Sequence, residues 1–499
     1  MLSHRQALKS LIRTYTITSR LYNTNTNTKQ TNKVSLYAVV SPLGKPNVNV
    51  TPELEKWVKS GNKVRFAELQ RIIFDLRKRK RYAQALQVSE WMRNKGTFEF
   101  TPVQHAVQLD LIGKVHGSLQ AESYFDSLKE ENKTDKVYGA LLHCYARQRQ
   151  TEKALSHLNV MKENGIALSS LAFIDIMCLY SNTGQNDKIP ILFTQMKDNG
   201  IRPDNLSYRI CINSFGLRSN FEGLENMLKE MENDSNIVMD WNTYTSVASF
   251  YIKAGMEEKA NIVLKKAEES LDTKDGLGYN HLISLYARLG NKDKVLSLWV
   301  LEKDVCKRCI NRDYINILES LVKIGEFEEA EKVFKEWELS GNCFDIRVVN
   351  AMIVGYIENG VCEKAEMLLD CSMKKGRALR LDIWGKLAIG YLEKGEVDNA
   401  MRSLKVGLSI NDDASVDNKL GDKMVMKMLM LVGTKGRVGD AEKVVSLLRS
   451  VVVLKRQMYQ VLLNSCVGAG KEVGGILDVM RADNFEVDKE TSKIREIEA

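Results

Sequence analysis

The sequence predicts an all-α solenoid built from about twelve helix-turn-helix repeats of 35 residues. Three observations predict it: a segment recurs with this period, each copy carries apolar residues at helical spacing, and helix-ending residues recur at matching places. The segment YNHLISLYARLGNKDKVLSLW begins at Tyr279 and closely resembles YGALLHCYARQRQTEKALSHL, which begins at Tyr138. A fixed period of this length indicates stacked supersecondary units.

Further copies of the segment lie in register with these two. Laid along the chain, the pattern yields about twelve units, whose anchoring apolar residues run from Leu69 to Tyr459. Because no unit can bury its apolar stripe alone, the stability of each unit must come from its neighbours in the stack. Consecutive copies begin 35 residues apart, at Tyr244, Tyr279, Tyr314, Val349 and Trp384.

Within one copy, two helices are predicted. Apolar residues at i, i+3, i+4 and i+7 form one face of the first helix. In the copy from Tyr279 these are Tyr279, Leu282, Ile283 and Tyr286. Gly290 and Asn291 interrupt this spacing, and they predict the turn of a helix hairpin. The second helix resumes with Val295, Leu298 and Trp299.

The end and the centre of the second helix are also marked. Gly165 and Gly200 each follow a Met by four residues, and glycine there can take the left-handed conformation that ends a helix. Small residues recur at the centre of the second helix, where they would let the two helices approach closely. They are Ala85, Ala121, Ala154, Ala260, Ala330, Ala365, Ala400 and Ala441.

The amino-terminal segment differs from the repeats. Residues 1–52 hold seven Lys or Arg and no Asp or Glu, and Leu8, Leu11, Ile12 and Tyr15 form a helical apolar face. This composition predicts a mitochondrial transit peptide over residues 1–33 and a matrix location. The alternative is a disordered basic tail. We further expect a linker with a short helix over 34–63, the solenoid over 64–490 and a tail over 491–499.

Net charge changes when this segment is set aside. The whole chain carries +8, but without residues 1–52 it holds 65 basic against 64 acidic residues. The excess of basic over acidic residues in the whole chain therefore does not indicate nucleic-acid binding by the mature protein. Any nucleic-acid surface must be local.

Catalytic and cofactor patterns are missing from the sequence. The six His are isolated, and no HExxH, P-loop or glycine-rich dinucleotide pattern is present. Cys306 and Cys309 form a lone CxxC, whereas a zinc site normally needs four ligands. No run of 18 apolar residues exists to cross a membrane. We therefore expect no enzyme activity, catalytic residue, metal, cofactor or small-molecule substrate, and no membrane span.

The repeats resemble those of the pentatricopeptide repeat family. Within this family they are similar to the plain class, and in particular to a plant mitochondrial subgroup. The resemblance rests on the 35-residue hairpin with Tyr near its start (TYTSVASFYIKAG), a Gly before the second helix, an EKA or EEA centre and endings such as NGIRPD. Tetratricopeptide repeats run at 34 residues with a W-LG-Y signature that these units lack. The resemblance implies a right-handed superhelix that binds single-stranded RNA, one base per repeat.

Site residues follow from the resemblance. In the family, the fifth and last residues of a repeat choose the base, which makes Thr245 with Asp275, Asn280 and Asn350 candidates for base reading. Other fifth positions hold poor base readers, namely Gly139, Ile174, Arg209, Ile315, Gly385 and Met426. A basic residue near the end of the first helix resembles the family's phosphate contact. It appears as Lys78, Arg147, Lys253, Arg288 and Lys323, and ordinary solvated charge is the alternative interpretation.

Two functions are compatible with these features. The first is a non-catalytic RNA-binding adaptor in mitochondria that stabilises, processes, helps edit or helps translate a transcript. The second is a helical scaffold that binds protein, for example as a component associated with the mitochondrial ribosome. The near-neutral mature charge and the few base-reading residues favour the scaffold, while the family and the basic positions favour the adaptor.

Overall fold

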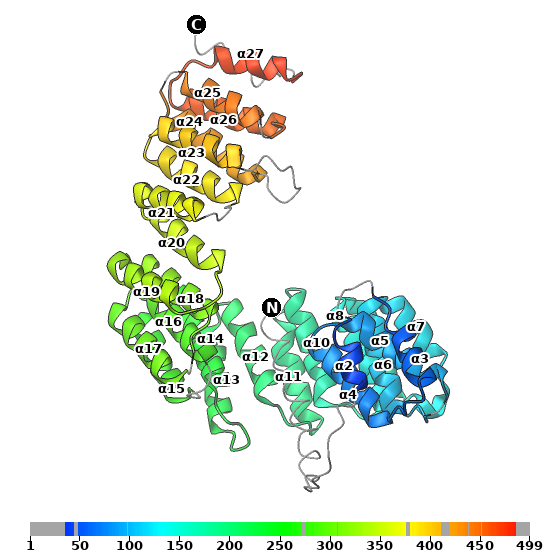
Figure 1. The fold of residues 1–499 in the computed structure, drawn as a ribbon. Coiled ribbons are helices and arrows are strands. Elements are labelled where there is room, and N and C mark those ends of the chain that lie inside the picture. The colour runs from blue at the N-terminus through cyan, green and yellow to red at the C-terminus, as the bar shows by residue number, and fades with distance from the viewer. Residues whose placement is uncertain are drawn as a thin grey trace. The chain divides into compact units, whose positions relative to one another are not determined.

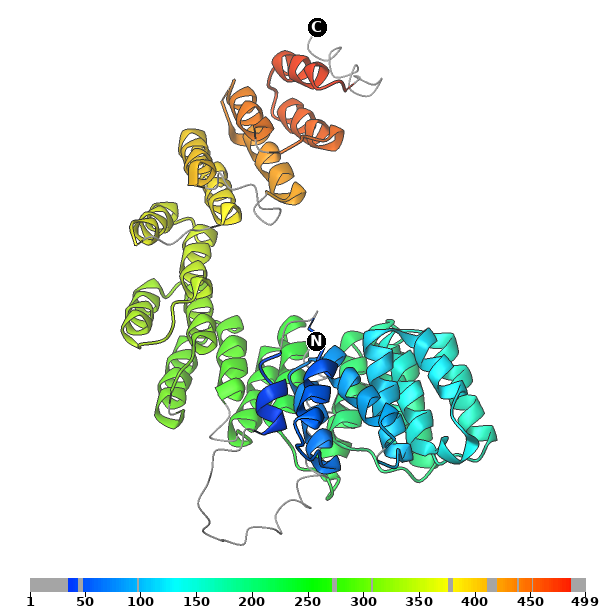
Figure 2. The same cartoon turned by 45° about the vertical axis from the view of Figure 1, so that its right-hand side comes forward.

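The computed structural model of the chain describes residues 35–43, 48–96, 98–271, 276–306, 308–375, 380–410, 420–437, 439–450 and 452–485. All regular elements in these residues are α-helices, apart from the 3-10 turn η1 (Glu130–Asn132). Figures 1 and 2 show consecutive helices folded back on one another as hairpins. The all-α prediction is confirmed.

The chain divides into two compact units, one up to Met239 and one from Asp240 on. The described residues of the first unit begin with two helices, α2 (Leu36–Val40) and α3 (Thr51–Lys59), in the segment where one short helix was expected. Five hairpins follow in the first unit. They are α4 (Phe66–Lys78) with α5 (Tyr82–Asn94), α6 (Pro102–Val115) with α7 (Ser118–Asp126), α8 (Asp135–Arg147) with α9 (Thr151–Glu163), α10 (Ser170–Asn182) with α11 (Lys188–Asp198), and α12 (Asn205–Leu217) with α13 (Phe221–Asn233).

The second unit holds seven hairpins, so the described residues form twelve in all, as the period predicts. The seven are α14 (Trp241–Lys253) with α15 (Glu257–Glu269), α16 (Gly276–Arg288) with α17 (Lys292–Val305), α18 (Asn311–Lys323) with α19 (Phe327–Leu339), α20 (Ile346–Glu358) with α21 (Cys362–Lys374), α22 (Leu381–Glu393) with α23 (Val397–Ile410), α24 (Asp422–Lys435) with α25 (Asp440–Arg449), and α26 (Arg456–Gly468) with α27 (Gly474–Ala482).

The helices of each unit form two layers. First helices of successive hairpins pack on one another, as α16 does on α14 and α18, and each also packs on the second helix of its own hairpin. The predicted apolar stripe of α16 lies in the core between these neighbours, with Tyr279, Leu282, Ile283 and Tyr286 at most 2% exposed. Burial of such stripes against adjacent repeats is what stabilises the stack.

Small residues at the centre of each second helix bring the layers together. All eight predicted alanines are buried, and Ala330 in α19 is completely so. A larger side chain at this point would have to displace the facing first helix, since protein interiors leave few voids. The interpretation of these alanines as close-contact positions is confirmed.

The predicted turns also form. Gly290 has a φ of +70°, a conformation that residues with a Cβ rarely adopt. Asn291 then caps α17, because its side-chain oxygen accepts a hydrogen bond of 3.1 Å from the backbone N–H of Lys294. Gly165 and Gly200 end second helices with φ of +65° and +69°, as predicted.

The expected transit peptide over 1–33 and the tail over 491–499 lie outside the described residues. The boundaries proposed for these segments and for the solenoid therefore stay predictions. Within the part of the chain that the structure describes, no helix is both long enough and apolar enough to span a bilayer.

Candidate nucleic-acid interface

The first-helix layer of the second unit presents three cationic side chains at equivalent places. Lys253, Arg288 and Lys323 are the last residues of α14, α16 and α18, and consecutive members are 35 residues apart. We call these three residues the basic row. A cation at the carboxyl end of a helix is favoured by the helix dipole, which accounts for part of their presence without any ligand.

Members of the basic row differ in their exposure to solvent and in the contacts that they make with other residues. Lys253 and Lys323 are exposed, and neither forms an ion pair with another described residue, but Lys253 Nζ lies 5.8 Å from the centre of the Phe250 ring. Arg288 is half-buried, and its Nη1 donates a hydrogen bond of 3.3 Å to Oγ of Ser249 on α14. The side chain of Arg288 thus lies across two adjacent first helices. Lys78, at the end of α4 in the first unit, is exposed like the two lysines.

Arg147 has a different environment from the other phosphate candidates. Its Nη2 donates a hydrogen bond of 2.6 Å to the carbonyl oxygen of Gly113, near the end of α6, and Gln148 Nε2 donates to the same oxygen at 3.1 Å. The carbonyls at a helix end lack intrahelical partners, so these donors cap the neighbouring first helix. Lys435 makes the equivalent contact with the carbonyl oxygen of Glu393 in the second unit. This capping gives Arg147 a structural role that the sequence did not predict.

Thr245 lies on α14 with only 5% of its surface exposed. Its hydroxyl donates a hydrogen bond of 3.2 Å to the carbonyl oxygen of Asn242, one turn earlier in the helix. Asp275, its predicted partner in base reading, lies outside the described residues. The pairing of these two residues stays a prediction.

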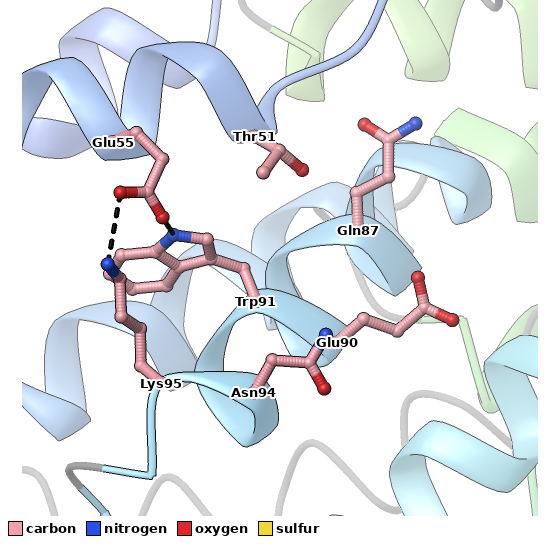
Figure 3. A pocket seen from close by; sticks show the side chains of 7 residues that line it. All are labelled: Thr51, Glu55, Gln87, Glu90, Trp91, Asn94 and Lys95. Carbon is pink, nitrogen blue, oxygen red and sulfur yellow. Dashed lines mark hydrogen bonds and ion pairs between the residues drawn. The ribbon is translucent and has the colours of Figure 1, made fainter.

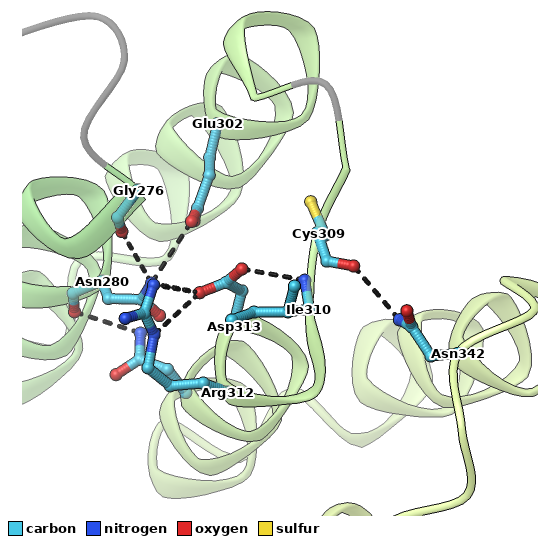
Figure 4. Close-up of polar contacts among 9 residues, drawn as sticks. Gly276, Asn280, Glu302, Cys309, Ile310, Arg312, Asp313 and Asn342 are labelled. Carbon is cyan, nitrogen blue, oxygen red and sulfur yellow. Dashed lines mark hydrogen bonds and ion pairs between the residues drawn. The ribbon is translucent and has the colours of Figure 1, made fainter. Parts of the chain in front are cut away.

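Asn280 lies within a buried polar cluster formed by α16, α17 and α18 (Figure 4). Its side-chain Nδ2, which carries two hydrogens, lies within hydrogen-bond distance of three acceptors: the carbonyl oxygen of Gly276 at 2.7 Å, Asp313 Oδ1 at 2.8 Å and Glu302 Oε1 at 3.2 Å. Asn280 Oδ1 accepts no hydrogen bond in the described part of the chain. The amide donors of Asn280 are therefore engaged inside the protein, and its oxygen is buried without a hydrogen-bond partner among the described residues.

Glu302 is the unusual member of this cluster. It is fully buried, and its Oε2 has no hydrogen-bond partner among the described residues. Burial, together with the nearby carboxylate of Asp313, raises the pKa of Glu302 to about 8. Arg312 acts in the opposite direction and forms an ion pair of 2.9 Å with Asp313. Glu302 is therefore largely protonated at neutral pH.

Asn350, on α20, is half-buried. Its Oδ1 is buried and accepts no hydrogen bond from the described residues. A buried polar atom without a partner costs free energy, which a bound donor would recover.

The first unit contains a charged network that sequence reasoning missed. Asp110 on α6 accepts from Arg77 at 2.8 Å and from Lys114 at 2.6 Å. Burial alone would raise the pKa of Asp110, but Lys114 and Arg77 outweigh it and hold this pKa at about 2. On the next pair of first helices, His143 Nδ1 lies 2.8 Å from Asp175 Oδ1, and this carboxylate raises the pKa of His143. Opposite charges separated by about one repeat were the signal that could have revealed both pairs.

A polar cleft of about 320 Å³ lies between α3 and α5 (Figure 3). Glu55 on α3 accepts a hydrogen bond of 2.6 Å from the indole nitrogen of Trp91 and one of 3.0 Å from Lys95. These two hydrogen bonds engage the carboxylate of Glu55 and link α3 to the carboxyl end of α5. No group of three or more His, Cys, Asp or Glu in the described residues is placed to hold a metal ion.

These features define a class: a helical-repeat protein with a regularly charged first-helix layer. Models of the PPR repeat match residues 136–166, 278–301, 314–342 and 347–377, and a pentatricopeptide repeat domain model matches 164–218. The chain is 47% identical over 96% of both chains to the mitochondrial pentatricopeptide repeat-containing protein At4g21705 of Arabidopsis thaliana. It belongs to the pentatricopeptide repeat family.

Two further similarities are more distant. The mitochondrial protein At2g20710 of the same organism is 34% identical over 74% of this chain and 76% of its own length. The crystal structure of the pentatricopeptide repeat protein PPR10 from maize is 19% identical, covers 95% of this chain and 68% of that one, and has a TM-score of 0.45.

Proposed function

We propose that this protein is a mitochondrial RNA-binding adaptor that stabilises, processes, helps edit or helps translate a transcript without chemistry of its own. The basic row carries this proposal. Its members recur at one structural position in consecutive repeats, and Lys253 and Lys323 are exposed without an ion-pair partner among the described residues. Mitochondrial relatives at high identity support the location.

Phosphate attraction would supply most of the affinity. Each Lys or Arg that neutralises a phosphate releases a counterion, so binding weakens as salt is added and depends little on base sequence. Lys253 and Lys323 are suited to this role because their ammonium groups remain in water. Lys78 would serve similarly in the first unit, whereas Arg147 is already engaged with the end of α6.

Base selection would be limited to a few repeats. Asn280 and Asn350 each have a buried Oδ1 without a hydrogen-bond partner among the described residues, which a base would reach only after the side chain moves. Both would therefore favour a base that presents a donor. Thr245 with Asp275 is the remaining candidate pair, and several other fifth positions carry apolar residues or glycine. We expect modest sequence preference in total.

The decisive experiment joins RNA and protein capture in one sample. The tagged protein would be crosslinked in isolated mitochondria, its bound RNA sequenced and its co-purifying proteins identified. A discrete set of crosslinked mitochondrial transcripts supports the adaptor. Purified mature protein with no RNA affinity above background at low salt would remove this proposal, since phosphate attraction is strongest there.

A protein-binding scaffold is the second candidate. The specific observation in its favour is the near-neutral charge beyond residue 52, with 65 basic against 64 acidic residues. Recovery of ribosomal proteins without RNA crosslinks in the same experiment would favour this function, for example as a component associated with the mitochondrial ribosome.

A further inference from the structure

The charges at the ends of the first helices change sign part-way through the second unit. Five consecutive first helices end on a charged residue, and each of these residues is 35 positions from the next. In order they are Lys253, Arg288, Lys323, Glu358 and Glu393, at the ends of α14, α16, α18, α20 and α22. The same structural position is thus cationic in three repeats and anionic in the next two.

Glu358, at the end of α20, lies near the end of α18, which carries the last member of the basic row. Its neighbour in the chain, Asn359, donates a hydrogen bond of 3.4 Å from Nδ2 to the carbonyl oxygen of Val322. Since Val322 precedes Lys323, this contact brings the end of α20 beside the end of α18. The change of sign therefore occurs between two adjacent helix ends.

Folding alone gives no reason for an acidic residue at this position. The helix dipole disfavours a negative charge at a carboxyl terminus, so Lys would be the more stabilising residue at 358. Glu358 is exposed, and it forms no ion pair with the described residues to offset this effect. Glu393 differs, because its carboxylate pairs with Lys427 at 2.7 Å and is partly neutralised.

A second carboxylate strengthens the negative charge next to the basic row. Glu319 lies on α18, one turn before Lys323, and is also exposed. The pKa of Glu319 is raised, first by the loss of water around its carboxylate and then by the charge of Glu358, which is the direction expected for two neighbouring carboxylates. Glu319 and Glu358 together form an acidic boundary at the end of the basic row.

We propose that the phosphates of a bound RNA strand follow the ends of α14, α16 and α18 and stop before the end of α20, because Glu358 there and Glu319 on the adjacent α18 repel the backbone. This inference rests on the proposed RNA-binding function. It adds that the RNA phosphates contact only three repeats of the second unit. At one base per repeat, this corresponds to about three nucleotides.

The test extends the basic row by one position. Glu358→Lys places a fourth cation 35 residues after Lys323, and Glu328→Lys on the second helix α19 makes the same change of charge at another exposed site. The dissociation constant of fluorescent oligouridine would be measured for both variants and the unaltered protein across a salt series, with thermal melting to check folding. Glu358→Lys should bind several-fold more tightly at low salt, and its salt slope should steepen by about 0.7, the value for one phosphate of a single strand.

The shortest oligouridine that reaches full affinity should also lengthen by about one nucleotide for Glu358→Lys alone. Equal effects of Glu358→Lys and Glu328→Lys, in a protein that binds RNA, would overturn the acidic boundary and leave RNA binding intact. Absence of binding by the unaltered protein at low salt would instead overturn the proposed function, and the boundary with it.

Discussion

The phenol of Tyr356 donates a hydrogen bond of 2.7 Å to Oε1 of Glu331, joining the first helix of one hairpin, α20, to the second helix of the preceding hairpin, α19. Lys364 on α21 binds the same oxygen at 2.8 Å. One carboxylate therefore ties three helices together across a repeat boundary. Glu366 receives Tyr391 and Arg402 in the same way one repeat later, and Glu268 receives Tyr286 and Lys294 two repeats earlier.

This clamp should contribute measurably to the coupling of neighbouring repeats. Tyr356→Phe removes one hydrogen bond to a charged acceptor and should lower the free energy of unfolding by about 1.5 to 3 kcal/mol. Glu331→Gln combined with Tyr356→Phe should cost less than the two single changes added together, because both act on one hydrogen bond. Denaturant titration of the three variants measures the coupling. If the changes in unfolding free energy of the two single variants add up to that of the double variant, this hydrogen bond does not contribute to stability.

Ala330 should tolerate no large charged side chain. Ala330→Arg overpacks a completely buried position and brings a charge into it, so the free energy of unfolding should fall by at least about 3 kcal/mol. Glu328→Arg, two residues earlier and exposed on the same helix, serves as the control and should cost no more than about 1 kcal/mol, the scale of a lost favourable charge in the first turn of a helix. Circular dichroism melting of both variants tests the register, and an unchanged melt for Ala330→Arg would contradict it.

Glu302 should make stability depend on pH. Its pKa is raised from an ordinary value near 4.5 to about 8, so the folded protein holds a proton that the unfolded chain releases. Stability should therefore fall as pH rises from about 4.5 to about 8, by an amount on the order of a few kcal/mol. Glu302→Gln, which stays neutral, should lose this part of the pH dependence.

The measurement for Glu302 is the difference in unfolding free energy between the unaltered protein and Glu302→Gln at several pH values. Other titrating groups, such as His143, are present in both proteins, so taking the difference removes their contribution. Glu328→Gln provides the control on an exposed carboxylate. A constant difference across pH 4.5 to 8 would show that Glu302 is not protonated in the folded state.

Neutralising the basic row should weaken RNA binding without changing its preference for bases. Changing Lys253, Arg288 and Lys323 to Ala should reduce the salt slope by about 0.7 for each phosphate that is no longer neutralised, and equally for unrelated RNA sequences. The matched control changes three exposed lysines of second helices to Ala, namely Lys265, Lys335 and Lys405. Equally weakened binding by both triple variants would show that only net charge matters.

The amino-terminal segment should direct a reporter into mitochondria. Residues 1–33 fused to a fluorescent protein should be imported. Reversing the charges of Arg5, Lys9 and Arg13 should abolish import, because the expected signal is a helix with an apolar face beside positive charges. Imaging of the fusion and of the charge-reversed variant measures this. Import that survives the reversal would contradict the transit peptide.

Sequence alone was sufficient for the helices and their pairing. The first helices α14, α16, α18, α20 and α22 begin 35 residues apart, as the anchors from Tyr244 to Trp384 predict. Helices form through hydrogen bonds between residues four apart, and a buried stripe needs only side chains three and four apart. This information is local in the chain, and its repetition made twelve hairpins predictable.

The surroundings of the candidate site residues were decided by tertiary structure. Asn280 was predicted from its place in the repeat, but Glu302 and Asp313, which engage its amide, lie 22 and 33 residues away. Arg147 was predicted as a phosphate contact from its place in the repeat, whereas its hydrogen bond to the carbonyl oxygen of Gly113 depends on the packing of α8 on α6. A periodic pattern states which face of a helix is buried, whereas the partner and the pKa of a side chain depend on which neighbours the stacked repeats bring within a few ångströms.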